Sequence, residues 1–213
     1  MKNFVNFWIK KGVIIKHPES VYIDENAEIG KNATIHPFSC ITGTTKIESG
    51  CEIGPGSDIQ NSYIAQKTKV VRSTISNSSI MSNCNIGPYS HIRNKVEIGE
   101  NCRIGNYVEI KKSIIKNNVK IAHLAYIGDA EIFENVNIGA GTITCNFDGK
   151  KKNKTIIKSN SFIGSNVSLI APVCINENVT IAAGSVITKD VSEGSLGVSR
   201  VQQKIIKNWK NKK

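Results

Sequence analysis

Aliphatic residues recur at a near-constant interval along most of the chain. Between Ile23 and Ile187 there are 27 such positions, 25 of them Ile, and 20 of the 26 steps between them are six residues long. Five further steps are five residues long, and one long step separates Ile138 from Ile157. Neither the 3.6-residue period of a helix nor the two-residue alternation of a strand produces this spacing. The chain is therefore predicted to consist of six-residue repeats.

A second column of small residues accompanies the first. Gly often follows the aliphatic residue directly, so the repeat unit is Ile-Gly-x-x-small-x. The small or β-branched residues of this second column include Ala27, Ala33, Ser39, Thr45, Cys51, Ser57, Cys84, Ser90, Val96, Cys102 and Val108. This hexapeptide repeat is typical of a parallel β-helix, in which each unit forms a short strand and a corner. Three units close one triangular coil, so residues 18 apart stack, both columns point inward, and about nine coils are expected.

Composition supports an all-β fold. The chain has 34 Ile and only 3 Leu, and β-branched side chains fit a pleated surface better than a helix. Aromatic residues make up only 6%, which suits a narrow interior. A length of 213 residues is enough for one domain of ordinary size. The six cysteines form no CxxC pair, so free thiols are expected and a zinc site is not.

The ends of the repeat define three parts of the chain. They are a cap or linker remnant over residues 1–19, a β-helix over 20–199 and a basic tail over 200–213. Phe4 and Trp8 have helical spacing in the first part. Val201, Ile205 and Trp209 predict a short amphipathic helix in the last. A loop is inserted at about residues 145–156, and such insertions in a rigid solenoid are usually functional.

The formal net charge of +11 is concentrated in two segments. Residues 150–158 carry five Lys, residues 200–213 carry one Arg and five Lys, and neither segment contains an acidic residue. The rest of the chain is neutral, and it contains no helix-turn-helix, zinc finger or aromatic stacking platform, so we do not expect a nucleic-acid partner. Two local basic segments suit small phosphorylated ligands.

The sequence contains no segment suited to crossing a membrane. Its longest uncharged stretch, residues 73–92 apart from His91, is half Ser, Asn, Thr and similar residues. Lys10 and Lys11 interrupt the N-terminal stretch where a signal peptide needs its apolar run. We therefore expect a cytoplasmic location without membrane insertion.

Two groups of outward-facing residues are candidates for chemistry. Arg93 and Lys111 each follow an Ile and lie 18 residues apart, so two cations should stack about 4.8 Å apart. Like charges at that spacing repel unless an anion lies between them, and either Glu109 or a bound phosphate fits this role. His123 follows Ile121 by two residues, and Ala140 holds the same place one coil later, within a Gly-rich run. A lone His is often structural, but this one has the surroundings that a general base needs.

The run from Lys120 to Thr155, KIAHLAYIGDAEIFENVNIGAGTITCNFDGKKKNKT, resembles the acetyltransferase domain of the bacterial bifunctional GlmU family. Enzymes of this family combine a glucosamine-1-phosphate N-acetyltransferase with an N-acetylglucosamine-1-phosphate uridyltransferase. The resemblance is strongest from Arg93 to Arg200 and weaker through GVIIKHPESVYID. It implies a left-handed β-helix, which is an exception to the right-handed crossover rule. It also implies a homotrimer with active sites between neighbouring subunits.

The resemblance assigns roles to individual residues of this chain. His123 matches the base that takes a proton from the sugar amine. The matches to residues that bind the amino-sugar phosphate are Arg93, Lys111, Tyr126, Asn137 and, from the loop and across the interface, Lys152. The matches to positions that line acetyl-CoA are Ala140, Asn146, Phe147, Ser165, Ala183 and Arg200. No metal is implied, and His17, His36 and His91 show no metal-ligand spacing with His123.

This sequence departs from the family pattern in three ways. Phe147 stands where Tyr is common, and Gln202 replaces a Pro that usually follows the arginine. The Gly-rich nucleotide loop of the uridyltransferase does not precede the repeat in this sequence, so no UTP-dependent step is assigned to it, and a separate uridyltransferase is a candidate partner.

These features predict the transfer of acetyl from acetyl-CoA to glucosamine 1-phosphate, for UDP-N-acetylglucosamine and cell-wall precursor synthesis. A hexapeptide acyltransferase with another acceptor, or a non-catalytic trimerising scaffold, remains an alternative. Cys145 lies near the predicted site, but no partner that would activate its thiolate is identified, so direct transfer is favoured over a covalent intermediate.

Overall fold

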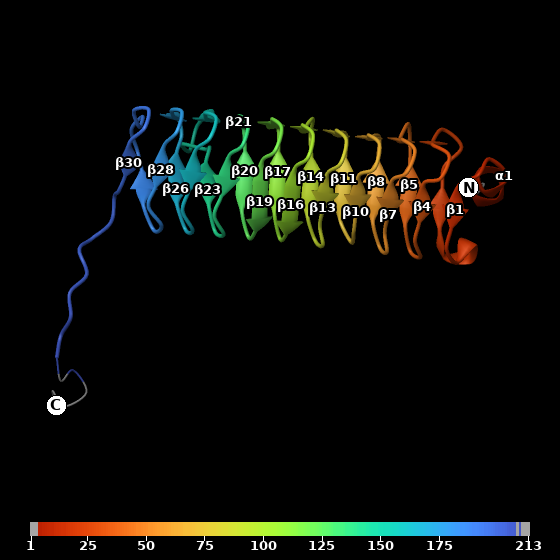
Figure 1. The fold of residues 1–213 in the computed structure, drawn as a ribbon, viewed down its shortest axis with the longest axis horizontal. Helices are drawn as coiled ribbons and strands as arrows, with labels where there is room; N and C mark the ends of the chain where they lie inside the picture. Colours follow the sequence, from red (N-terminus) through yellow and green to blue (C-terminus); the bar gives the residue numbers. More distant parts are fainter. Residues whose placement is uncertain (1–3, 208, 210–213) are drawn as a thin grey trace.

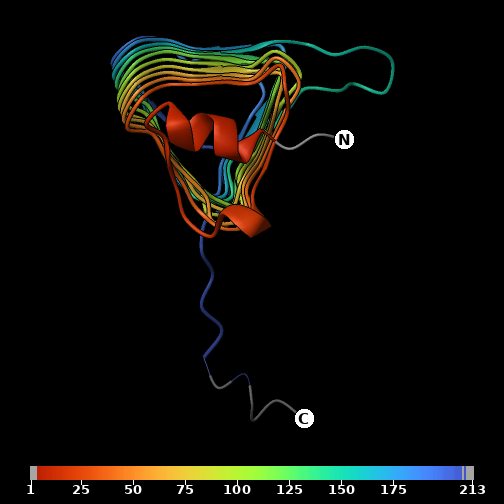
Figure 2. The same cartoon turned by 90° about the vertical axis from the view of Figure 1, so that its right-hand side faces the viewer.

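The computed structural model of the protein describes residues 4–207 and 209. The chain winds into a parallel β-helix whose coils stack side by side (Figure 1). Viewed along its axis, the solenoid is triangular, and each wall is one parallel sheet (Figure 2). The predicted all-β hexapeptide fold is thus confirmed.

Each sheet takes every third strand of the chain. Sheet 1 contains β1 (Ile14–Ile15), β4 (Thr34–Ile35), β7 (Glu52–Ile53), β10 (Lys69–Val70), β13 (Asn85–Ile86), β16 (Arg103–Asn106), β19 (Lys120–His123), β22 (Asn137–Ile138), β25 (Phe162–Ile163), β28 (Thr180–Ile181) and β30 (Leu196–Gly197). Sheet 2 contains β2 (Tyr22–Ile23), β5 (Cys40–Thr42), β8 (Asp58–Gln60), β11 (Thr74–Ser76), β14 (His91–Arg93), β17 (Glu109–Lys111), β20 (Tyr126–Gly128), β23 (Ile143–Cys145), β26 (Ser168–Ile170) and β29 (Val186–Ile187). Sheet 3 contains β3 (Glu28–Ile29), β6 (Lys46–Ile47), β9 (Tyr63–Ile64), β12 (Ser79–Ile80), β15 (Glu97–Ile98), β18 (Ile114–Ile115), β21 (Ala130–Ile132), β24 (Thr155–Ile157) and β27 (Val173–Ile175).

The solenoid has about ten coils rather than nine. Sheet 1 extends beyond the regular Ile column at both ends, from β1, within the segment expected to be a cap, to β30. These outer strands add backbone pairing, since Ile14 pairs with Thr34 and Leu196 with Thr180. Ile14 in β1 and Leu196 in β30 are exposed. A search for buried aliphatic residues at six-residue spacing therefore does not find these two strands.

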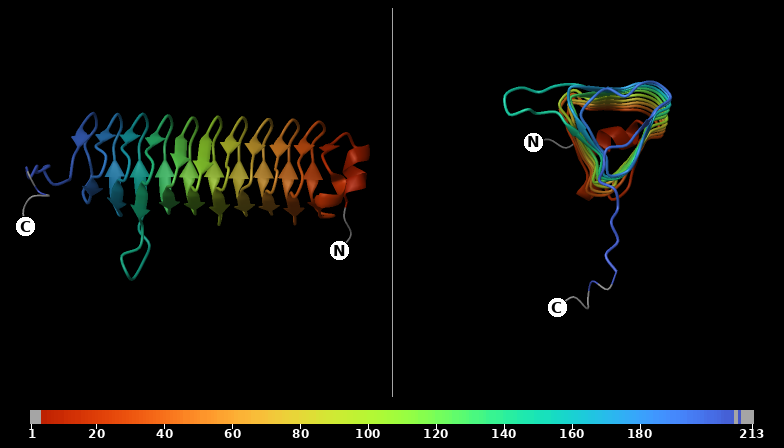
Figure 3. Two further views of the ribbon diagram at one scale, coloured as in Figure 1. Left: turned by 90° about the horizontal axis from the view of Figure 1, so that it is seen from below. Right: turned by 90° about the vertical axis from the view of Figure 1, so that its left-hand side faces the viewer.

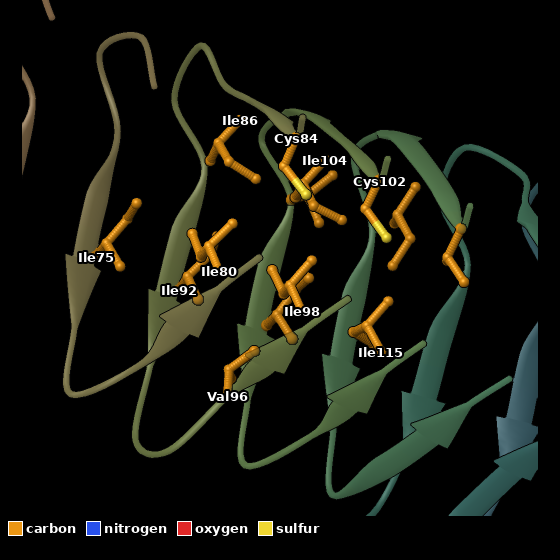
Figure 4. Packing of buried hydrophobic residues seen from close by; sticks show 14 of the residues in the cluster. Ile75, Ile80, Cys84, Ile86, Ile92, Val96, Ile98, Cys102, Ile104 and Ile115 are labelled. Carbon is orange, nitrogen blue, oxygen red and sulfur yellow. The ribbon is translucent and has the colours of Figure 1, made fainter. Parts of the chain in front are cut away.

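The Ile column forms the core. Register places most column Ile residues against the Ile of the next coil, as Ile86 pairs with Ile104 and Ile104 with Ile121. The column residues are almost completely buried, and Cys84 and Cys102 fill the narrow space beside them (Figure 4). The same stack therefore supplies both the hydrophobic stabilisation and the alignment of outward side chains along each wall.

Asparagine occupies many corners of the solenoid. Eleven Asn residues have positive φ, a conformation that Asn tolerates better than most residues with a side chain. At one corner, Asn118 Nδ2 donates to Asn135 Oδ1 and Asn135 Nδ2 donates to Asn160 Oδ1, both at 3.1 Å. Side-chain ladders thus help to hold successive coils in register.

A short helix covers the first coil. Helix α1 (Val5–Lys10) lies across the triangular opening in Figure 2, with Val5 buried and Trp8 packed against the core. A 3-10 turn, η1 (Pro18–Ser20), follows β1. Within the described part of the chain, every helix is too short to span a membrane.

Within the described residues, one internal loop interrupts the coils, between β23 and β24. This loop over residues 146–154 projects from the triangle (Figure 3), and an antiparallel bridge joins Phe147 to Lys152. The Asp148 carboxylate accepts hydrogen bonds from the N–H groups of Lys150 and Lys151 and from Asn153 Nδ2. These bonds, mainly the one from Lys151, lower the pKa of Asp148 to about 2.

The predicted C-terminal helix is wrong for residues 201–207, which contain no helix. The chain here runs away from the last coil (Figure 1), and Val201 and Ile205 are 91% and 78% exposed. A helix of this length is marginal in water unless an apolar face packs against something, and within the described residues these side chains are left exposed. Residues 208 and 210–213 of the predicted helix and tail lie outside the described residues.

Candidate active site

Two cations stack on sheet 2, as the spacing predicted. Arg93 at the end of β14 pairs in register with Lys111 at the end of β17, and Gly128 at the end of β20 continues the row. Glu109 Oε1 accepts hydrogen bonds from Arg93, including one of 3.1 Å from Nε. The arginine is therefore paired, whereas none of the described residues forms an ion pair with Lys111 within 4 Å.

The inserted loop adds a third cation. Lys152 lies close enough to Lys111 of its own chain to lower the pKa of Lys111, with smaller contributions from desolvation and Arg93, while Asp129 opposes the shift. The neighbouring Lys154 forms an ion pair of 2.6 Å with Glu131. The side chains of Lys111 and Lys152 thus create a local excess of positive charge, which a phosphate would neutralise.

A glycine provides the surface on which Tyr126 lies. A Cβ added at Gly128 would come within 2.6 Å of Tyr126 Oη and 2.8 Å of Asn146 Nδ2, so the ring occupies space that any side chain would fill. Asn146 is only 7% exposed and donates from Nδ2 to Asp129 Oδ2 at 2.5 Å. Asn146 and Tyr126 therefore both lie beside Gly128, and Asn146 is buried on this protomer.

His123 is held by a side chain that sequence analysis did not identify. His123 at the end of β19 pairs in register with Asn106 at the end of β16. The distance from His123 Nδ1 to Asn106 Oδ1 is 2.6 Å. His123 is exposed, so its other ring nitrogen is accessible from solvent.

Small residues follow His123 along the same corner. Ala140, Ser165 and Ala183 occupy the equivalent position on the next three coils, and their N–H groups donate no backbone hydrogen bond within the described part of the chain. Arg200 reaches back to this column, where Nη1 donates to the Ala183 carbonyl at 2.9 Å. The structure thus brings together four of the six residues predicted to line acetyl-CoA.

The remaining predicted residues lie elsewhere. Asn137 begins β22, at the opposite edge of sheet 1 from His123 and Ala140. Phe147 is 60% exposed on the projecting loop. One protomer therefore carries the predicted residues on two faces of the prism.

Asn106 and Gly128 were missed because neither residue type is conspicuous in this chain. A signal for Asn106 was present, since it follows Ile104 by two residues just as His123 follows Ile121. Within the described residues, no group of three or more His, Cys, Asp or Glu side chains is arranged to hold a metal ion.

The family of the chain follows from its repeats. The sequence profile described as "Bacterial transferase hexapeptide (six repeats)" matches residues 26–61, 77–112 and 154–189, just over half of the chain. The chain belongs to this family. The three matched segments coincide with regular coils, and the residues around His123 and the inserted loop lie between the second and third of them.

Curated relatives of this hexapeptide transferase include proteins named "Bifunctional protein GlmU". The protein from Picosynechococcus sp. is 50% identical over 95% of the chain, and that from Thermosipho africanus is 51% identical over 94%. The chain spans 45% of the length of each relative. The resemblance that the sequence motifs indicated is thus confirmed.

Solved structures share the fold of this hexapeptide transferase at low sequence identity. An Arabidopsis UDP-N-acetylglucosamine acyltransferase superposes with a TM-score of 0.58 at 19% identity, covering 84% of this chain and 69% of that chain. The corresponding Francisella novicida enzyme has a TM-score of 0.53 at 19% identity, with coverages of 87% and 67%.

Proposed function

We propose that this hexapeptide transferase moves the acetyl group of acetyl-CoA to the amine of glucosamine 1-phosphate, giving N-acetylglucosamine 1-phosphate. The observation that carries the proposal is that His123 begins a column of backbone N–H groups without described backbone partners, while the adjoining sheet 2 carries a cation cluster. About 50% identity to GlmU proteins across nearly the whole chain supports the choice of acceptor. The product would supply the synthesis of UDP-N-acetylglucosamine in the cytoplasm, with a uridyltransferase step acting next.

The acceptor binds over sheet 2. Its phosphate lies between Lys111 and Lys152, whose mutual repulsion it relieves, and Arg93 flanks them on the preceding coil. Tyr126 packs against the sugar from the start of the next strand. This arrangement orients the amine toward the corner at which His123 lies.

His123 acts as the general base. Its Nε2 takes a proton from the amine as the nitrogen attacks the thioester carbonyl and the C–N bond forms. The oxyanion that develops accepts a hydrogen bond from the Ala140 N–H, which no described backbone group occupies. The C–S bond then breaks, and the coenzyme A thiolate leaves and takes up the proton from His123. The N–H groups of Ser165 and Ala183 extend this column along the bound coenzyme.

The complete site lies between copies in a homotrimer. Asn137 begins β22, at the other edge of sheet 1 from His123 and Ala140, so we infer that a second copy supplies it to the same acceptor. The exposed apolar residues of the tail, including Val201 and Ile205, would be available to pack against a neighbouring copy in such an assembly. If so, His123→Ala and Asn137→Ala protomers, each inactive alone, restore turnover when they are mixed and reassembled.

The test of the activity is thiol release from acetyl-CoA in the presence of glucosamine 1-phosphate, glucosamine 6-phosphate and glucosamine. We expect turnover with glucosamine 1-phosphate and a loss of about 10²–10⁴-fold in His123→Ala. Calorimetry of coenzyme A binding to the same variant controls for folding. Preference for another amine would replace the acceptor, near-normal turnover of His123→Ala would remove the base, and failure to bind coenzyme A would favour a scaffold.

A further inference from the structure

We propose that Asn106 is a positioning residue that fixes the tautomer of His123, and this inference rests on the proposed function. Asn106 touches neither the proposed acceptor nor the coenzyme column. It acts on the reaction through the imidazole. Fixing the tautomer of His123 matters for a general base, whereas a histidine that only fills a corner of the coil would not require it.

The hydrogen bond determines which ring nitrogen carries the proton. Asn106 Oδ1 lies 2.6 Å from His123 Nδ1, and an amide oxygen can only accept. Nδ1 therefore carries the hydrogen and donates it, and Nε2 keeps its lone pair. The partner of one imidazole nitrogen sets the protonation of the other, so this bond presents a ready base at Nε2.

The backbone around the pair fixes its geometry from both sides. A Cβ at Gly105 would lie 1.9 Å from the Ala122 carbonyl oxygen, so β16 and β19 approach closely just before Asn106 and His123. Immediately after the pair, the Leu124 N–H donates to the Asn106 carbonyl at 3.0 Å. Asn106 and His123 are thus tied together through backbone as well as side chain.

The charged groups on the two strands that carry the pair come earlier in each strand. Arg103 and Lys120 precede Asn106 and His123 by three residues on β16 and β19. Tyr107 stacks on Tyr89 at the adjoining corner, with ring centroids 5.5 Å apart, and Tyr126 begins β20 after the turn. β22, on the other side of β19, contributes only uncharged side chains, Asn137 and Ile138. A carboxylate introduced at position 106 would therefore place an acidic group in contact with an imidazole whose side-chain partner among the described residues is Asn106.

Two substitutions separate the role of the acceptor from the role of charge. Asn106→Ala removes the acceptor and frees His123 to adopt the wrong tautomer. Asn106→Asp keeps an acceptor at the same distance and adds a negative charge that favours the protonated imidazolium. Asn85→Ala is the matched control, because Asn85 is an exposed residue of β13 in the same sheet, away from His123.

The experiment measures kcat, KM and the pH profile of kcat/KM for the full chain, with NMR of ¹⁵N-labelled histidine to identify the protonated nitrogen. For Asn106→Ala we expect kcat to fall about tenfold or more, but by less than the roughly 10²–10⁴-fold that a general base contributes. The KM for acetyl-CoA and the KM for glucosamine 1-phosphate should change little. For Asn106→Asp we expect most of kcat to return above neutral pH, with the acidic limb of the profile moved to higher pH. The control should match the unsubstituted protein.

Several outcomes would overturn the inference. They are a fall in thermal stability without a fall in kcat, equal losses in Asn106→Ala and Asn106→Asp, or a proton found on Nε2 of the unsubstituted protein. If His123→Ala itself retains turnover, the proposed base fails instead. The histidine spectrum still reports the Asn106–His123 bond in that case, so the two failures are distinguishable.

Discussion

Gly128 lies where even one methyl group would displace the Tyr126 ring. The Cβ of Gly128→Ala would be 2.6 Å from Tyr126 Oη and 2.8 Å from its Cζ, about 0.8 Å and 0.6 Å inside the 3.4 Å at which ordinary van der Waals contact begins. The third close atom, Asn146 Nδ2, is held by Asp129 and is less free to move. Overpacking of this kind costs about 1–3 kcal/mol.

A double-mutant cycle tests the structural part of this prediction. Because two of the three close contacts are with Tyr126, Gly128→Ala should cost at least about 1 kcal/mol less when Tyr126 is already Ala. Chemical unfolding of the four proteins, followed by circular dichroism, measures the coupling. Additive costs would refute the contact that the geometry describes.

The functional part of the prediction concerns only the acceptor. Displacing Tyr126 should raise the KM for glucosamine 1-phosphate several-fold and leave the KM for acetyl-CoA unchanged, because the Ala140 column lies on another edge of the coil. Steady-state kinetics with each substrate varied separately measures both. An equal rise in both KM values would mean that the coil itself has been disturbed.

Three further predictions concern charge, packing and the loop. Lys111→Met removes the repulsion with Lys152, so the ligand-free protein should melt at or above the temperature of the unsubstituted chain, while the stabilisation by added glucosamine 1-phosphate disappears in differential scanning fluorimetry. Ile104→Ala opens a cavity at a fully buried position and should cost about 2–5 kcal/mol by chemical unfolding, whereas Ile104→Val should cost about 0.5–1.5 kcal/mol. The pKa of Asp148 is depressed, so its contribution to loop order is present above the ordinary pKa of 3.8 and is lost only as pH falls through about 2. Asp148→Ala should therefore expose the loop to limited proteolysis at neutral pH, and an unchanged cleavage rate would contradict this.

Sequence spacing predicted the Arg93–Lys111 stack but missed the partner of His123. Three six-residue steps separate the two cations, so an 18-residue offset is correct for them. One step before His123 is five residues long, because the turn between β17 and β18 is shorter, and the stacking partner lies 17 residues away. A fixed offset of 18 points to Gly105 and passes over Asn106. The position within the hexad, rather than the count of residues, identifies the partner.

Positions outside the repeat were harder to predict. The inserted loop has no periodicity, so nothing in its sequence shows that Lys152 folds back beside Lys111 or that Asn146 is buried and bonded to Asp129. Val201 and Ile205 have the spacing of an amphipathic helix, but residues 201–207 of the single protomer contain no helix. A helical pattern forms a helix in a short segment only when a surface is present for its apolar face.

By itself, the sequence determined the solenoid, because burying an Ile every sixth residue leaves only a coil of three short walls and decides which side chains face outward. The tertiary structure alone decided which of those outward side chains meet. His123 bonds Asn106, Tyr126 lies over Gly128 and Lys152 approaches Lys111 because turn lengths, side-chain rotamers and the path of the loop are set by contacts between coils. Such contacts depend on the packing of neighbouring coils, which the repeat pattern of the sequence does not specify.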